Sequence, residues 1–128
     1  MILIIMYDPE LMKGARNLRA RAYRKNLMGR FDESFDLTNR AISMLEKEVC
    51  KDYYNELVRL YFFIGNEGKC IKYLEEEIAA SHQWRNEYTR TDEAYMYGSR
   101  YLDAAISIKE KELTALRSGN KTKWTSHF

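Results

Sequence analysis

The residues able to carry out acid–base, nucleophilic or metal chemistry are few in this chain of 128 residues. It contains two histidines, His82 and His127, and two cysteines, Cys50 and Cys70. A metal site needs several such side chains at ligand spacing, as in HExxH or CxxC, and neither pattern occurs. We therefore expect no metal and no cofactor. Two isolated thiols of this kind are typical of a helical core in a reducing compartment.

Other catalytic arrangements are equally poorly supported. Cys70 and His82 stand 12 residues apart on one expected helix, about 18 Å along its axis, which excludes a Cys–His pair if that helix is unbroken. The three glutamates at positions 75–77 point around the same helix, so we expect them to be solvated and not to form a carboxylate pair. The segment from Gly65 to Gly68 lacks the Lys-Ser/Thr of a phosphate-binding loop. The sequence therefore predicts a protein that is not an enzyme.

Positive charge is concentrated near the start of the chain. The net charge is only +2, and acidic residues return from Asp32 onward. A basic helix beside neutral or acidic ones gives a locally polarised surface, which suits a negatively charged partner. Against the single acidic residue Glu10, the segment up to residue 30 carries the cations Lys13, Arg16, Arg19, Arg21, Arg24, Lys25 and Arg30.

The composition favours one all-α domain spanning residues 1–128. Hydrophobic residues make up 45% and charged residues 31%, which is the balance of a folded domain and not of a disordered chain. The one proline, Pro9, compares with roughly six expected from average usage. Such a scarcity of breakers favours long helices over a β-sheet fold, which needs frequent turns.

Capping residues and breakers divide the chain into about five antiparallel helices. Asp8 and Pro9 start the first, because an aspartate can cap free amides and proline suits the first helical position. Gly29 ends it, since glycine adopts the left-handed conformation without a Cβ clash. The second helix runs from Asp32 to about Cys50, the third from its cap Asp52 to Gly65, the fourth from Glu67 to Tyr88, and the fifth from Thr91 to Ser118.

Helical periodicity predicts which side chains of these helices are buried. The third helix is apolar on most sides, so we expect it to be the central one. The expected buried positions of the others are Leu11, Ala15, Leu18, Ala22 and Met28; Phe31, Phe35, Thr38, Ala41, Ile42, Leu45 and Val49; Cys70, Ile71, Leu74, Ile78 and Ala79; and Ala94, Tyr97, Tyr101, Leu102, Ala105, Ile108, Leu113 and Leu116.

The two ends of the chain are set apart from the helices. Residues 1–8 form an apolar segment that lacks a basic flank and is far shorter than the roughly 20 apolar residues of a membrane span. We interpret it as a segment packed on the body of the protein, with no role at a membrane. Residues 118–128 show little pattern, and we expect a mobile tail. These features favour a cytoplasmic protein.

Two stretches carry spacings of small and bulky residues that define a helical hairpin. In the first, Gly29, Phe31, Ser34 and Ala41 resemble the turn between the two helices of a tetratricopeptide repeat. The second begins 36 residues later, near the family's repeat length of about 34. It departs from the pattern at Glu67 and Glu77, and a fainter third copy starts at Gly98. The second copy comprises Tyr54, Leu57, Tyr61, Gly65, Cys70 and Leu74.

This resemblance covers roughly residues 14–80 and leaves two architectures open, a tetratricopeptide-like hairpin array and a small five-helix bundle. It implies that the first helix of each repeat lines a groove that holds a segment of a partner protein. The chain would then act as an adaptor or inhibitor, and the mixture of side chains suits an acidic, partly apolar segment. By position, the groove residues are Arg16, Arg19, Tyr23 and Asn26 from the first helix, and Asn55, Arg59 and Phe62 from the third.

Three other interpretations remain open at this level. The basic first helix could bind nucleic acid, with Tyr23 stacked on a base and phosphates contacted by Arg16, Arg19, Arg24 and Lys25. The tyrosines of the fifth helix could be covered by a homodimer formed through the last two helices. The arginines could also form a solvated face with no partner. Salt dependence separates the first alternative from the protein-binding groove, because phosphate contacts weaken steeply with salt.

Overall fold

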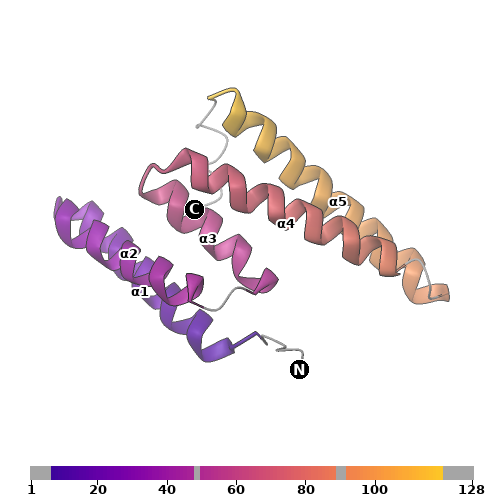
Figure 1. Ribbon diagram of the computed structural model, residues 1–128, viewed down its shortest axis with the longest axis horizontal. Helices are drawn as coiled ribbons and strands as arrows, with labels where there is room; N and C mark the ends of the chain where they lie inside the picture. Colours follow the sequence, from indigo (N-terminus) through magenta and orange to yellow (C-terminus); the bar gives the residue numbers. More distant parts are fainter. Residues whose placement is uncertain (1–6, 48–49, 89–91, 120–128) are drawn as a thin grey trace. The chain divides into compact units, whose positions relative to one another are not determined.

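A computed structural model describes residues 7–47, 50–88 and 92–119. For residues 87–88 and 92–101 it describes the backbone only, and for the others the side chains as well. This described part is all-α, as predicted, and contains no strand. The helices are α1 (Pro9–Leu27), α2 (Phe31–Glu46), the short 3₁₀ helix η1 (Lys51–Tyr53), α3 (Tyr54–Phe63), α4 (Glu67–Tyr88) and α5 (Asp92–Arg117) (Figure 1). Contacts group into two compact units, Met1–Cys70 and Ile71–Phe128, with the division inside α4.

The start and the end of α1 are determined by the residues expected from the sequence. Asp8 caps the helix, because its Oδ1 accepts hydrogen bonds from the backbone nitrogens of Glu10 at 3.0 Å and Leu11 at 3.3 Å. Pro9 occupies the first helical position. Gly29 follows the helix with a φ of 76°, in the left-handed region that glycine adopts without strain.

Small side chains bring α1 and α2 together as an antiparallel hairpin. Ala15 and Ala22 of α1 are fully buried, and Ser34 of α2 is nearly so. The Ser34 hydroxyl donates to the backbone oxygen of Ala22 at 2.7 Å, so the two helix backbones lie close at this point. Thr38 continues the same buried row of α2. The hairpin therefore depends on residues too short to hold the helices apart.

The expected buried face of α2 is correct along most of its length but wrong at its start. Thr38, Ala41, Ile42 and Leu45 are buried as predicted, and the buried Ser34 and Leu37 were not predicted. In contrast, Phe31 is 64% and Phe35 57% exposed. Periodicity identifies the face of a helix that tends to be covered, but it does not say how far along the helix the cover extends.

Two smaller expectations, one about a buried position and one about the end of a helix, also fail. Met28 is 62% exposed, because it follows the last residue of α1 and so lies outside the packed stripe, whereas the unpredicted Met12 is buried. The second helix ends at Glu46, short of Cys50. Val49 lies outside the described residues.

The chain enters α3 through η1, which the sequence did not predict. Asp52 lies within η1 and accepts a weak hydrogen bond from the Cys50 thiol at 3.8 Å, so it is not the cap of α3. Tyr53 is fully buried, and its hydroxyl accepts from the backbone nitrogen of Asp8 at 2.9 Å. The 3₁₀ turn places this ring against the start of α1, and the α-helix proper begins at the next residue, Tyr54.

In the second unit, α4 and α5 lie side by side and run antiparallel (Figure 1). Leu74, Ile78, Leu102 and Leu116 are buried as expected, and Ile106 and Ala115 join them. The prediction is wrong for Ala79 and for Ile108, which is 52% exposed. Helix α5 is continuous through Gly98, so no turn exists there for a third repeat. Ala94, Tyr97 and Tyr101 fall outside the described side chains, as does the tail beyond residue 119.

Candidate binding face of α1 and α3

Helices α1 and α3 approach each other in parallel within the first unit. The Nε of Arg19 lies 2.5 Å from Oε1 of Glu56, and further along both helices the rings of Tyr23 and Phe63 have centroids 6.4 Å apart. Because the residue numbers rise together in the two contacts, the helices point the same way. The side chains predicted to form a groove come from these same two helices.

Arg19 belongs to the packing of this face. The Glu56 side chain is only 2% exposed, and that of Arg19 is 27% exposed. A carboxylate so deeply buried needs a charged hydrogen-bond partner, and the guanidinium supplies it from the neighbouring helix. Arg19 was expected to contact a partner protein, but its guanidinium is already committed inside the fold. Its role here is to hold α1 against α3.

The other predicted residues of α1 form an exposed row. Arg16, Tyr23 and Asn26 are all exposed, with Tyr23 at 51%. Together with Arg19 they recur at intervals of three, four and three residues, which places them along one side of a helix. Two members of the row, Arg19 and Tyr23, contact α3, and the other two, Arg16 and Asn26, lie beyond them at either end.

The predicted residues of α3 form a matching row. Asn55, Arg59 and Phe62 are spaced by four and three residues, so they share one side of α3. Asn55 is exposed and its Oδ1 accepts from Arg59 Nε at 3.2 Å, while Arg59 and Phe62 are half-buried. The two residues of α3 that touch α1 are Glu56 and Phe63. Asn55 and Phe62 are next to them in the chain, and Arg59 lies one helical turn from each. Both predicted rows thus flank one helix–helix contact.

Four cations of α1 make no ion pair with any described residue. Elsewhere on the hairpin, Lys25 and Arg30 each approach Glu33 at 3.6 Å. Such uncompensated charge on one helix creates a positive potential that attracts an anionic group. The four, all exposed, are Lys13, Arg16, Arg21 and Arg24.

Sequence reasoning named Tyr23 and Phe62 but missed two other apolar residues of this face, Leu27 and Phe63. Leu27, one turn beyond Tyr23, is 69% exposed, and the half-buried Phe63 supports the Tyr23 ring. Leu27 stood at helical spacing from Tyr23, which could have marked it. Nothing in the sequence could have marked Glu56 as buried, because its burial depends on the distant Arg19.

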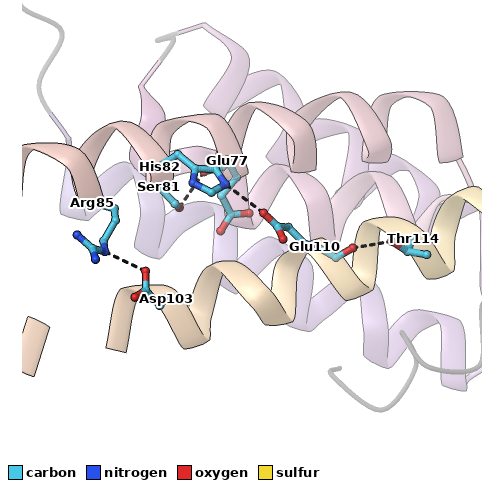
Figure 2. Close-up of polar contacts among 7 residues, drawn as sticks. All are labelled: Glu77, Ser81, His82, Arg85, Asp103, Glu110 and Thr114. Atoms are coloured by element: carbon cyan, nitrogen blue, oxygen red, sulfur yellow. Dashed lines mark hydrogen bonds and ion pairs between the residues drawn. The ribbon is translucent and has the colours of Figure 1, made fainter. Parts of the chain in front are cut away.

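The second unit carries its polar contacts between α4 and α5 (Figure 2). Arg85 pairs with Asp103 at 2.9 Å and His82 with Glu110 at 3.0 Å, both among exposed or half-buried side chains. Glu77 was expected to be solvated, which is wrong: it is buried, and its Oε1 lies 2.6 Å from Lys109 Nζ. Helix α4 directs this position inward, toward α5. These contacts join the two helices, and the group that the His82 ring contacts is the Glu110 carboxylate.

Other kinds of site have little support in the described part of the chain. There, no cluster of three or more His, Cys, Asp or Glu side chains is placed to hold a metal ion. Cys50 and Cys70 are buried thiols, and Cys70 donates to the backbone oxygen of Val58 at 3.5 Å. Helix α4 joins Cys70 to His82 without a break, as the exclusion of a Cys–His pair requires. No described helix has both the length and the apolar character that crossing a bilayer requires.

Comparisons with protein-family models, with curated proteins and with solved structures found no match to this chain.

Proposed function

We propose that this chain is a non-enzymatic, tetratricopeptide-like interaction module that binds an acidic, partly apolar segment of another protein on the face of α1 and α3. The observation that carries the proposal is a set of exposed cations on α1 that have no carboxylate partner among the described residues. Two of them, Arg16 and Arg24, stand before and after the exposed Tyr23 in the helix. Guanidinium groups beside an aromatic ring are the side chains most enriched at binding hot spots. The two buried thiols fit a reducing compartment such as the cytoplasm.

A protein segment suits this face better than nucleic acid. Leu27 and Phe62 add apolar surface on both helices, which a protein partner can cover with aliphatic side chains but phosphates cannot. A nucleic-acid site would depend mainly on the cations, so its affinity would fall steeply with salt. Adaptor and inhibitor are both compatible with such a surface, since each acts by occupying a partner.

The test compares two charge-reversal variants that change net charge equally. The first, Arg16→Glu with Arg24→Glu, alters the proposed face; Arg19 stays intact because it holds the buried Glu56. The second, Arg40→Glu with Lys69→Glu, alters exposed positions of the same unit on α2 and α4. Each variant and the wild type are immobilised and exposed to extract of the native cell with and without nuclease. Circular dichroism confirms that all three are folded.

We expect a protein that resists nuclease, is retained by the wild type and the control, and is lost from the Arg16/Arg24 variant. Its purified form should bind with a modest salt dependence. Loss of all captured material on nuclease treatment would replace the proposal with nucleic-acid binding. Equal capture by all three proteins would show that the basic face is only solvated surface.

A further inference from the structure

One row of exposed residues runs along α1 with the spacing of a helix–helix seam. Lys13, Arg16, Ala20, Tyr23 and Leu27 are separated by three, four, three and four residues, and all five are exposed. This alternation keeps side chains in line along a helix and is the pattern by which one helix packs against another. The inward face of α1, with Met12, Ala15 and Ala22, is already covered. The row is therefore a second face of the same helix, uncovered within the described residues and with the spacing of a helix–helix seam.

The middle of this row permits close approach of another backbone. Ala20 has the shortest side chain of the five and lies between Arg16 and Tyr23. Small residues at the centre of a helix contact let the two helix axes come near each other, as Ala22 and Ser34 do between α1 and α2. The larger side chains can then pack around the incoming helix. These are Lys13 and Arg16 before Ala20, and Tyr23 and Leu27 after it.

Charge selects the kind of helix that can occupy the row. Its first half is basic, with Lys13 and Arg16, and Arg24 flanks its second half; none of these is paired within the described residues. A second copy of this chain would bring the same cations together, and like charges facing each other oppose association. An acidic helix would instead neutralise them.

We propose that the partner segment is an amphipathic acidic α-helix that lies along α1, centred on Ala20, with aliphatic side chains on Tyr23 and Leu27 and carboxylates toward Lys13, Arg16 and Arg24. This inference rests on the proposed function and adds the conformation and the position of the bound segment. The described length of α1, 19 residues, matches a bound helix of about five turns. Helix-on-helix docking of this kind uses anchors spaced by three and four residues.

The test uses a displayed library of random 20-residue peptides as probe, selected for binding to the full wild-type chain. Enriched peptides are synthesised and titrated against three variants. Ala20→Arg adds bulk at the centre of the row, keeps high helix propensity and adds a positive charge, so any loss of an acidic peptide cannot come from the charge. Ser43→Arg makes a similar change at an exposed position of α2. Arg16→Glu with Arg24→Glu reverses the charge of the face.

We expect enriched peptides to carry aliphatic residues at intervals of three and four with Asp or Glu beside them, and to gain helical circular dichroism on binding. Ala20→Arg should weaken binding by about tenfold or more, because overpacking forces the helices apart. Ser43→Arg should leave affinity unchanged, and the charge reversal should abolish binding.

Each other outcome has a distinct meaning. Some peptides could lose affinity for the charge-reversal variant and yet bind Ala20→Arg with the same affinity as the wild type. They would occupy the face in another conformation. The inference then fails and the proposed function stands. Enrichment of no peptide, or of peptides insensitive to the charge reversal, overturns both. A concentration-dependent dimer that Ala20→Arg dissociates would make a second copy the occupant and overturn the acidic helix.

Discussion

Arg19 and Glu56, 37 positions apart in the chain, form a charged hydrogen bond of 2.5 Å that joins α1 to α3. The carboxylate is almost completely buried, whereas about a quarter of the arginine side chain reaches solvent. The pair helps to hold the two helices that carry the proposed binding face, and it commits the Nε of Arg19 to a contact inside the fold.

Replacing Arg19 with methionine should destabilise the protein by about 3 kcal/mol, because the buried Glu56 carboxylate would lose its compensating charge. Urea unfolding followed by circular dichroism measures the loss. Arg16→Met, on the same helix but exposed and without an ion pair among the described residues, should change stability by less than about 0.5 kcal/mol. Adding Glu56→Gln to Arg19→Met should recover part of the stability. Equal losses for Arg19→Met and Arg16→Met would show that the pair contributes nothing to folding.

Gly65→Ala should destabilise the turn before α4 by about 1 kcal/mol. Gly65 has a φ of 78°. An added Cβ would have no surrounding atom within 4 Å, but alanine is strained in this left-handed backbone conformation because its Cβ crowds its own backbone. Gly68→Ala is the matched control, because Gly68 is helical and an added Cβ has open space around it, with Asn66 Oδ1 the nearest atom at 3.9 Å. It should stabilise the protein by about 0.5 kcal/mol. The thermal unfolding midpoints of the two variants are compared with that of the wild type. A shift of both in the same direction would contradict the different backbone requirements of Gly65 and Gly68.

Lys109→Met should cost more stability than Arg117→Met, although both remove a cation that lies 2.6 Å from a glutamate. Lys109 pairs with the buried Glu77, whereas Arg117 pairs with Glu75 and both of those side chains are about half exposed. We expect a loss of about 2 kcal/mol for the first variant and under about 1 kcal/mol for the second. The difference should persist in 0.5 M salt, since a buried pair is screened less. Chemical denaturation at two salt concentrations checks both points.

Tyr61 should make the protein less stable at alkaline pH. Burial, together with a hydrogen bond to the Glu46 carboxylate and its negative charge, raises the pKa of the Tyr61 phenol well above its usual value. Below about pH 10 the phenol is protonated in both folded and unfolded chains, and its contribution is fully present. As pH rises further, only the unfolded chain loses the proton, so folding stability falls toward the raised pKa.

In Tyr61→Phe, stability at neutral pH should fall by about 1 kcal/mol because the hydrogen bond to Glu46 is lost. The decline of stability between about pH 9 and pH 11 should become shallower than in wild type, since one group that titrates differently in the two states is gone. Urea unfolding across this range measures both effects. An unchanged slope would mean that Tyr61 ionises equally easily in the folded chain.

The sequence alone predicted where most of the helices start and end, because local chemistry determines these positions. Asp8, Pro9, Gly29 and Gly65 act through capping, a fixed φ or access to positive φ, and each needs only its neighbours in the chain. The continuous α4 was foreseen for the same reason, because no proline lies between Glu67 and Tyr88 and the one glycine, Gly68, stands in the first turn. The rows of the candidate face were equally predictable, since residues three and four apart share a side of any helix.

Tertiary structure decided which of those side chains are covered and which are paired. Phe31 and Phe35 continue an apolar stripe yet remain exposed, while Glu56 and Glu77 are buried on helices where a carboxylate would ordinarily face water. Burial of a charge becomes tolerable only when a cation distant in sequence arrives beside it, as Arg19 and Lys109 do. Periodicity describes one helix at a time, whereas coverage and charge compensation belong to pairs of helices, so only the packed chain could determine them.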